Sequence, residues 1–249
     1  GYHGHSLGSL AATANLEHRA AAGASLPGVT FLPFSSGGPT GEFASLPFLR
    51  AILEDSHSGV EKPAGIVVET VQAEGGVNVA PAEWLRELRS ICDEHGIVLI
   101  VDEIQTGCGR TGPFFSFERA GIVPDVITLS KSISGYGQPM AITLLRPELD
   151  LWKPAEHTGT FRGNQLAFVT AAAALQLWED EGIEAGTRAR AAIVHDELTQ
   201  SVLPLHPAVE LRGIGLIWGV DTVGIDPTGA LARAIGRRCF ADGLIIERT

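Results

Sequence analysis

Cysteine, basic residues and long apolar runs are all scarce in this chain of 249 residues. Its three cysteines, Cys92, Cys108 and Cys239, lie far apart and form no CxxC pair, which argues against a disulfide framework and a metal site. No apolar run approaches the roughly 20 residues that cross a bilayer, so we expect no membrane span. Because nothing at the N-terminus is typical of a signal peptide, we expect a cytoplasmic protein.

The charge balance argues against another class of partner. Lys and Arg total 18 against 29 Asp and Glu, which gives a formal net charge of −11. A protein with this negative net charge repels the phosphate backbone of nucleic acids, and we expect no nucleic-acid partner. A composition of 45% hydrophobic and 19% charged residues is typical of a globular chain with its own core.

Three apolar segments, each followed by polar residues, recur at intervals of about 30 residues, the size of a βαβ unit. They are GIVVE (65–69), IVLIVDE (97–103) and VITLSK (126–131). Continuous Val, Ile and Leu runs favour parallel strands covered on both faces. The segment PAEWLRELRSICDEHG places its apolar residues on one helical face and predicts a crossover helix, with Trp84, Leu85, Leu88, Ile91 and Cys92 buried. The sequence therefore predicts an α/β fold with a mostly parallel sheet.

The second half of the chain favours a smaller α/β region. A long Ala-rich helix is expected over 166–178, followed by a helix near 183–203, strands within 209–220, a helix over 230–241 and a last strand over 244–247. We place a domain boundary near residue 165. The chain opens on a turn-like GYHGHSLG and stops at IIERT, so we expect further chain at both ends.

Open α/β sheets bind ligands at the carboxyl ends of their strands, where Glu69, Asp102 and Lys131 all stand. We therefore expect these three to converge. A buried Asp102 is suited to hold a protonated pyridine nitrogen, although a carboxylate that caps a turn explains the same position. Lys131 precedes the small turn SISGYG, and an amine there is suited to attack a carbonyl group. A lysine that reaches into solvent is the alternative.

Four runs carry a resemblance to a known family. They are VETVQAEGGVNV, VDEIQTGCGRTG, ITLSKSISGYGQPMAITLL and HTGTFRGNQLAFVTA, in this order. The chain resembles the class III aminotransferases, which have the pyridoxal-phosphate (PLP) fold type I. The resemblance implies a large PLP-binding domain over 1–165, without its N-terminal part, and a connecting helix with part of a small C-terminal domain over 166–249.

The resemblance implies roles for five cofactor-side residues. Lys131 would bind PLP covalently and act as the proton-transfer base, and Asp102 would pair with the pyridine nitrogen. Gln105 would bind the ring hydroxyl group. Tyr2 and His3 resemble an aromatic and histidine pair whose aromatic ring stacks on the cofactor, and an ordinary turn is the alternative.

Three further residues receive roles from the same resemblance. Glu69 would brace the cofactor-side network, and Glu74 would act as the glutamate that admits both an ω-amine and the α-carboxylate of a substrate. Thr160 would reach the cofactor phosphate of a neighbouring subunit, which implies a homodimer or a larger homo-oligomer. Taken alone, the run GTFRGN is merely a loop.

Within the family, SKSISGYGQPMA and GTFRGNQLAFVTA most resemble the branch that forms diaminobutyrate in ectoine synthesis. The implied reaction is amino transfer between L-glutamate and aspartate 4-semialdehyde, giving 2-oxoglutarate and L-2,4-diaminobutyrate. Ornithine, acetylornithine, 4-aminobutyrate or a β-amino acid are alternative substrates. A catalytically silent partner protein with the same fold is another alternative, and a nucleotide-binding protein has little support because no G-x-G-x-x-G follows the strands.

Overall fold

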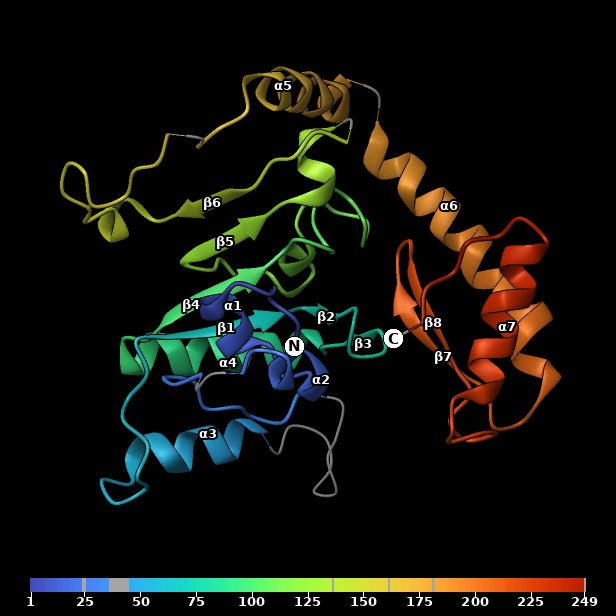
Figure 1. The fold of residues 1–249 in the computed structure, drawn as a ribbon, viewed down its shortest axis with the longest axis horizontal. Helices are drawn as coiled ribbons and strands as arrows, with labels where there is room; N and C mark the ends of the chain where they lie inside the picture. Colours follow the sequence, from blue (N-terminus) through green and yellow to red (C-terminus); the bar gives the residue numbers. More distant parts are fainter. Residues whose placement is uncertain (24–25, 36–44, 136, 161, 181, 249) are drawn as a thin grey trace.

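The central feature of the computed structural model is a four-stranded sheet with the order β1-β4-β5-β6 (Figure 1). The structure describes residues 1–23, 26–35, 45–135, 137–160, 162–180 and 182–248. The strands are β1 (Gly65–Glu69), β4 (Val98–Asp102), β5 (Val126–Leu129) and β6 (Ile142–Leu145). The first three run parallel, and β6 runs antiparallel to β5. The predicted α/β fold with a mostly parallel sheet is therefore confirmed.

The crossover helix α4 (Ala82–His95) joins β1 to β4 and covers one face of the sheet. Pro81 precedes it, and Gly96 ends it in the left-handed conformation at φ 62°. Its buried residues are those that the helical periodicity predicts, namely Trp84, Leu85, Leu88, Ile91 and Cys92. They pack with Leu46 and Leu49 of α3 (Ser45–Glu54) in the main apolar core.

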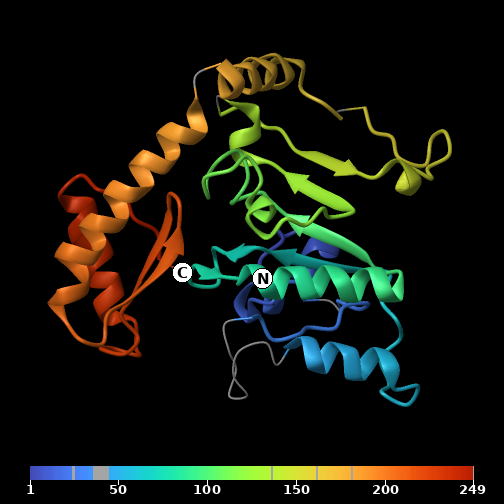
Figure 2. The same ribbon diagram turned by 180° about the vertical axis from the view of Figure 1, so that it is seen from behind.

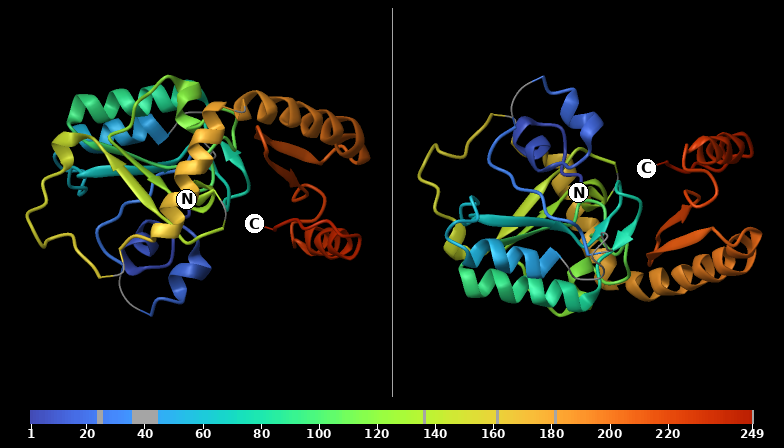
Figure 3. Two further views of the ribbon diagram at one scale, coloured as in Figure 1. Left: turned by 90° about the horizontal axis from the view of Figure 1, so that it is seen from above. Right: turned by 90° about the horizontal axis from the view of Figure 1, so that it is seen from below.

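Residues 1–20 cover the opposite face of the sheet (Figure 3). They contain two short helices, α1 (Leu7–Ala12) and α2 (Leu16–Ala20). A small hairpin of β2 (Val71–Gln72) and β3 (Asn78–Val79) follows β1. Three 3-10 turns connect the remaining strands of this half: η1 (Ser116–Ala120), η2 (Lys131–Ser134) and η3 (Pro147–Leu149).

The second half begins with the long helix α5 (Gln165–Asp180), which passes η2, and continues in α6 (Ile183–Glu197). A π-helical turn η4 (Leu198–Val202) and η5 (Leu203–Leu205) lead to the antiparallel pair β7 (Glu210–Ile214) and β8 (Ile217–Asp221). Helix α7 (Ala230–Ala241) packs in this smaller group, which lies beside the main sheet (Figure 2). The helices and the strand pair agree with those expected, whereas the domain boundary near residue 165 stays a prediction.

Two expectations are wrong. Residues 244–247 form no strand, because no other strand lies beside them in the described chain to take up their backbone hydrogen bonds; Ile245 is 82% exposed. The three parallel strands are also not covered on both faces throughout. Val67 of β1, a strand at the end of the sheet order, is 40% exposed. Among the described helices, none combines the length and apolar character needed to cross a membrane.

Candidate active site

The ends of three parallel strands bring the predicted residues to one edge of the sheet. Glu69 pairs in register with Asp102, and Asp102 pairs with Thr128 of β5. Lys131 follows two residues after β5 ends. Because parallel strands end at the same edge, the side chains after β1, β4 and β5 share one region, as the sequence predicts.

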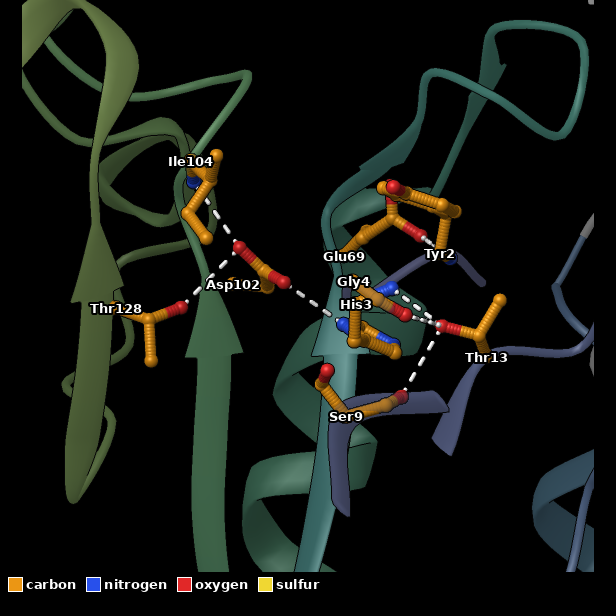
Figure 4. Close-up of polar contacts among 9 residues, drawn as sticks. All are labelled: Tyr2, His3, Gly4, Ser9, Thr13, Glu69, Asp102, Ile104 and Thr128. Carbon is orange, nitrogen blue, oxygen red and sulfur yellow. Dashed lines mark hydrogen bonds and ion pairs between the residues drawn. The ribbon is translucent and has the colours of Figure 1, made fainter. Parts of the chain in front are cut away.

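Asp102 makes three side-chain polar contacts at this edge (Figure 4). Its Oδ1 accepts hydrogen bonds from the backbone N–H of Ile104 and the hydroxyl of Thr128, both at 3.1 Å. Its Oδ2 lies 2.7 Å from Nδ1 of His3, and the Asp102 residue is 7% exposed. One oxygen therefore caps the following turn, as the alternative interpretation expects, while a role toward a pyridine nitrogen stays a prediction.

His3 is held in place by a residue for which the sequence gives no functional signal. The backbone N–H of His3 donates to the hydroxyl of Thr13 at 2.9 Å, and this hydroxyl lies 3.1 Å from the carbonyl oxygens of Gly4 and Ser9. Thr13 is fully buried. Its contacts span about ten residues and arise only when α1 folds back, so no local motif predicts them.

Glu69 lies beside Tyr2 and near His3 (Figure 4). Its Oε1 accepts the backbone N–H of Tyr2 at 2.8 Å, and the residue is 6% exposed. Burial raises the pKa of Glu69, and the Tyr2 hydrogen bond and the nearby His3 oppose that rise only in part. Glu69 thus ties the segment of residues 1–3 to the end of β1, and its role toward a cofactor stays a prediction.

The Tyr2 ring packs edge-on against two histidines. Its centroid lies 5.5 Å from that of His5 and 5.6 Å from that of His18, and both contacts are edge-to-face. Such pairs restrict the ring plane. The structure fixes Tyr2 beside the Glu69 and His3 groups, while its stacking on a cofactor stays a prediction.

Gln105 and Glu74 meet each other. The amide nitrogen of Gln105 donates to Oε1 of Glu74 at 2.7 Å. Glu74 stands in the turn between β2 and β3, and Gln105 stands three residues after the end of β4. The sequence predicts both residues at the site but gives no signal for this bond between them.

Lys131 begins η2 in a conformation that is unusual for a lysine. Its φ is 49°, in the left-handed region that residues with a side chain rarely adopt. Strained backbone of this kind gathers at functional sites. The turn also packs closely against helix α5, since a Cβ on Gly135 would lie 2.6 Å from Cβ of Ala174 in that helix. Lys131 is exposed, and its covalent role toward a cofactor stays a prediction.

Thr160 does not join this group in the described chain. It is exposed in the segment between β6 and α5, and β6 runs antiparallel to β5. The segment therefore leaves the sheet at the edge opposite to the ends of β1, β4 and β5 (Figure 1). A role for Thr160 toward a neighbouring subunit stays a prediction, and Tyr136 and Phe161 of the quoted motifs lie outside the described residues.

Comparisons with known proteins agree with this architecture. The sequence profile described as aminotransferase class III matches residues 1–249. The diaminobutyrate–2-oxoglutarate transaminase of Streptomyces anulatus is 51% identical over 99% of this chain and 57% of its own length. The enzyme of the same name from Bordetella parapertussis is 49% identical over 99% of this chain and 56% of its own length.

The fold is similar to that of solved aminotransferase structures. The ornithine aminotransferase of Toxoplasma gondii superposes with a TM-score of 0.83 at 28% identity, over 100% of this chain and 55% of that chain. An aminotransferase of Bacillus anthracis superposes with a TM-score of 0.87 at 25% identity, over 100% of this chain and 59% of that chain. The chain belongs to the class III aminotransferase family, whose members are PLP-dependent enzymes. It spans somewhat more than half the length of the curated relatives that it matches.

Proposed function

We propose that the protein transfers an amino group between L-glutamate and aspartate 4-semialdehyde, giving 2-oxoglutarate and L-2,4-diaminobutyrate. The names of relatives at about half identity over nearly the whole chain support this substrate pair. The observation that carries an aminotransferase function is the buried pair of His3 and Asp102 at a strand end next to the turn of Lys131.

The donor set of this edge suits pyridoxal phosphate. A lysine amine, a fixed carboxylate, an amide and an aromatic ring are the groups that this cofactor needs for its carbonyl, its pyridine nitrogen, its ring hydroxyl and its ring face. When bound, PLP supplies an electron sink for the charge that develops as the substrate loses its α-proton. Lys131, Asp102, Gln105 and Tyr2 would hold it in those four roles.

The residues of this chain take separate roles in the proposed reaction. The Asp102 carboxylate would hold the pyridine nitrogen of the cofactor, and His3, Ile104 and Thr128 keep its two oxygens in place. The amine of Lys131 would act as the base that takes up the proton from the substrate's α-carbon, and its exposed position leaves it room to reach the substrate. Glu69 holds the segment that carries His3 and Tyr2.

The substrate side of the proposal rests on Glu74. In its present position the Glu74 carboxylate repels a substrate carboxylate. The one hydrogen bond that the side-chain amide of Gln105 donates to Glu74 is easily broken when glutamate enters. Glu74 in place accommodates an aldehyde or amine end, and Glu74 turned away admits the α-carboxylate. We further propose that Thr160 reaches the cofactor phosphate of a neighbouring subunit in a homodimer, and that the enzyme acts in the cytoplasm in ectoine synthesis.

Amino-acceptor profiling tests the substrate assignment. The full-length protein with PLP and L-glutamate should convert aspartate 4-semialdehyde with a kcat/KM at least about tenfold above that for the semialdehydes of ornithine, acetylornithine or 4-aminobutyrate, a difference of about 1.4 kcal/mol between transition states. Faster turnover of one of the other semialdehydes would move the assignment to that substrate. No turnover with any acceptor, despite bound PLP, would favour a catalytically silent protein.

A further inference from the structure

Glu103, the neighbour of Asp102, is a buried carboxylate with no role in the site described above. It is 1% exposed. Successive residues at a strand end point to opposite faces, so Asp102 faces His3 while Glu103 faces inward. The backbone N–H of Glu103 donates to the carbonyl of Thr128, and its own carbonyl accepts the N–H of Gly107, both at 2.9 Å.

The Glu103 carboxylate receives hydrogen bonds from three sides. Its Oε1 accepts the hydroxyl of Ser116 at 2.6 Å and the backbone N–H of Phe117 at 3.3 Å, and its Oε2 accepts the hydroxyl of Thr106 at 2.6 Å. The hydroxyl of Thr70 makes a short contact with that of Ser116. Since Ser116 gives its only proton to Glu103, the Thr70 hydroxyl is the donor between the two.

This group of Glu103, Thr106, Ser116 and Thr70 contains no cationic side chain. Burial raises the pKa of Glu103, and the hydroxyl and N–H donors oppose that rise. Among the described residues Glu103 forms no salt bridge. The guanidinium group of Arg119 interacts electrostatically with Glu103 without forming a salt bridge. A buried carboxyl group without a salt-bridge partner is unfavourable for folding unless its hydrogen bonds are all made, which here requires three separate segments to stay in place.

The segments of Thr70 and Ser116 flank the turn that carries Gln105. Thr70 directly follows β1, Glu103 follows β4, Thr106 stands within the turn, and Ser116 begins η1. Gln105 lies between two members of the group and reaches Glu74 from there. Backbone packs closely within the turn, since a Cβ on Gly107 would lie 2.8 Å from the carbonyl oxygen of Glu103.

We propose that Glu103 is a positioning residue that fixes the turn of residues 103–107, so that Asp102 and Gln105 are presented to the cofactor in a preformed arrangement. The inference rests on the proposed function, in which PLP binds at this edge. Glu103 acts through hydrogen-bond geometry, so an amide in its place is tolerated. The amide oxygen of a glutamine can accept from Ser116 and Phe117, and its NH₂ group can donate to the oxygen of Thr106.

The test compares three variants of the full-length protein: Glu103→Ala, Glu103→Gln, and Leu88→Ala as a control. Leu88 is a buried core residue of α4 outside the group, and its truncation destabilises the fold without touching the turn. In the protein without PLP, backbone amides of residues 104–108 should exchange at least about tenfold faster in Glu103→Ala, the effect of about 1.4 kcal/mol of lost local stability. Glu103→Gln and Leu88→Ala should leave those amides within about threefold of the wild type.

Titration with PLP supplies the second readout. Glu103→Ala should bind PLP at least about tenfold more weakly than the wild type, while Glu103→Gln and Leu88→Ala bind within about threefold. Equal effects of Glu103→Ala and Leu88→Ala in both readouts would overturn the inference, as would failure of Glu103→Gln to restore the turn. If Glu103→Ala does not fold, Thr106→Val, which removes one donor, takes its place with the same criteria.

The two readouts separate this inference from the proposed function. Should the wild type bind no PLP, the proposed function fails, and the exchange of residues 104–108 still decides whether Glu103 fixes the turn. Should the wild type bind PLP and all variants bind it equally, the proposed function stands and the positioning role of Glu103 fails.

Discussion

At the scale of single residues, the geometry of the site depends on the hydrogen bonds that the two carboxylate oxygens of Asp102 make. One oxygen accepts hydrogen bonds from Ile104 and Thr128, and the other lies 2.7 Å from the His3 imidazole. Hydrogen bonds to an ionised carboxylate are stronger than those between neutral groups. His3 therefore orients the Asp102 carboxylate, which is the group proposed to face the pyridine nitrogen. The sequence predicted His3 only as the neighbour of an aromatic ring.

Replacing His3 with phenylalanine tests this point. The ring volume stays while Nδ1 is lost, so Asp102 loses one charge-assisted partner worth about 1.5–3 kcal/mol. We expect kcat/KM with L-glutamate to fall about tenfold to a hundredfold and PLP binding to weaken. His57→Phe is the matched control, because the His57 side chain is 93% exposed in a loop away from the site. Unchanged kinetics in His3→Phe would show that Asp102 needs no imidazole.

At the scale of elements, Asp125 ties the sheet to its flanking helix. It begins the turn into β5, and its Oδ2 accepts the backbone N–H of Leu99 and a guanidinium hydrogen of Arg89, both at 2.7 Å. Its Oδ1 lies 3.0 Å from Nε of Arg146. Burial raises the pKa of Asp125, but the hydrogen bonds from Leu99 and Arg89 and the charges of Arg89 and Arg146 outweigh it, and the net pKa lies below 3.8.

The variant Asp125→Asn should lower the free energy of unfolding by about 1–3 kcal/mol at pH 7, because an amide keeps one acceptor but no charge. A carboxyl whose folded pKa is depressed adds stability that is complete above its unfolded value and disappears as the pH falls through the folded pKa. The difference between wild type and variant should therefore shrink as the pH drops below 3.8.

Urea unfolding of both proteins across this range measures the effect. Glu83→Gln serves as the control, since Glu83 is 71% exposed in a helix pair with Arg86 and should change stability little. A difference between wild type and Asp125→Asn that is constant with pH would contradict the assignment.

The elements that could be predicted are those with a strong periodic pattern. The five buried residues of α4 follow from their helical spacing, and α7 spans the residues expected. The β2 and β3 hairpin was not predicted, because two strands of two residues each leave no periodic signal. The strand expected over 244–247 failed because apolar content alone does not supply a pairing partner.

For the site, sequence order predicts which residues stand at strand ends but not what they touch. Asp102, Glu69 and Lys131 could be placed together because parallel strands share an edge. The bond between Gln105 and Glu74 and the anchoring of His3 by Thr13 depend on how loops fold back. The Glu103 group joins residues up to 46 positions apart, which no local pattern reveals.

At the scale of the whole molecule, the loop after β4 lies at the junction of the two halves. A Cβ on Gly109 would lie 2.3 Å from the Trp178 ring of α5, and the backbone N–H of Leu216 donates to the carbonyl of Arg110 at 2.8 Å. The same loop carries Gln105. The second half of the chain is therefore in direct contact with the loop that carries Gln105.

The central claim is that Lys131 binds PLP covalently, and chemical mapping tests it most directly. The sequence has only two other lysines, Lys62 and Lys153, so the modified peptide identifies the lysine that binds PLP. The full-length protein is incubated with PLP, reduced with borohydride, digested and analysed by mass spectrometry. We predict a phosphopyridoxyl group on Lys131, and its loss together with the visible absorbance band in Lys131→Ala. A group found on Lys62 or Lys153 instead, or a band that persists without Lys131, would contradict the account.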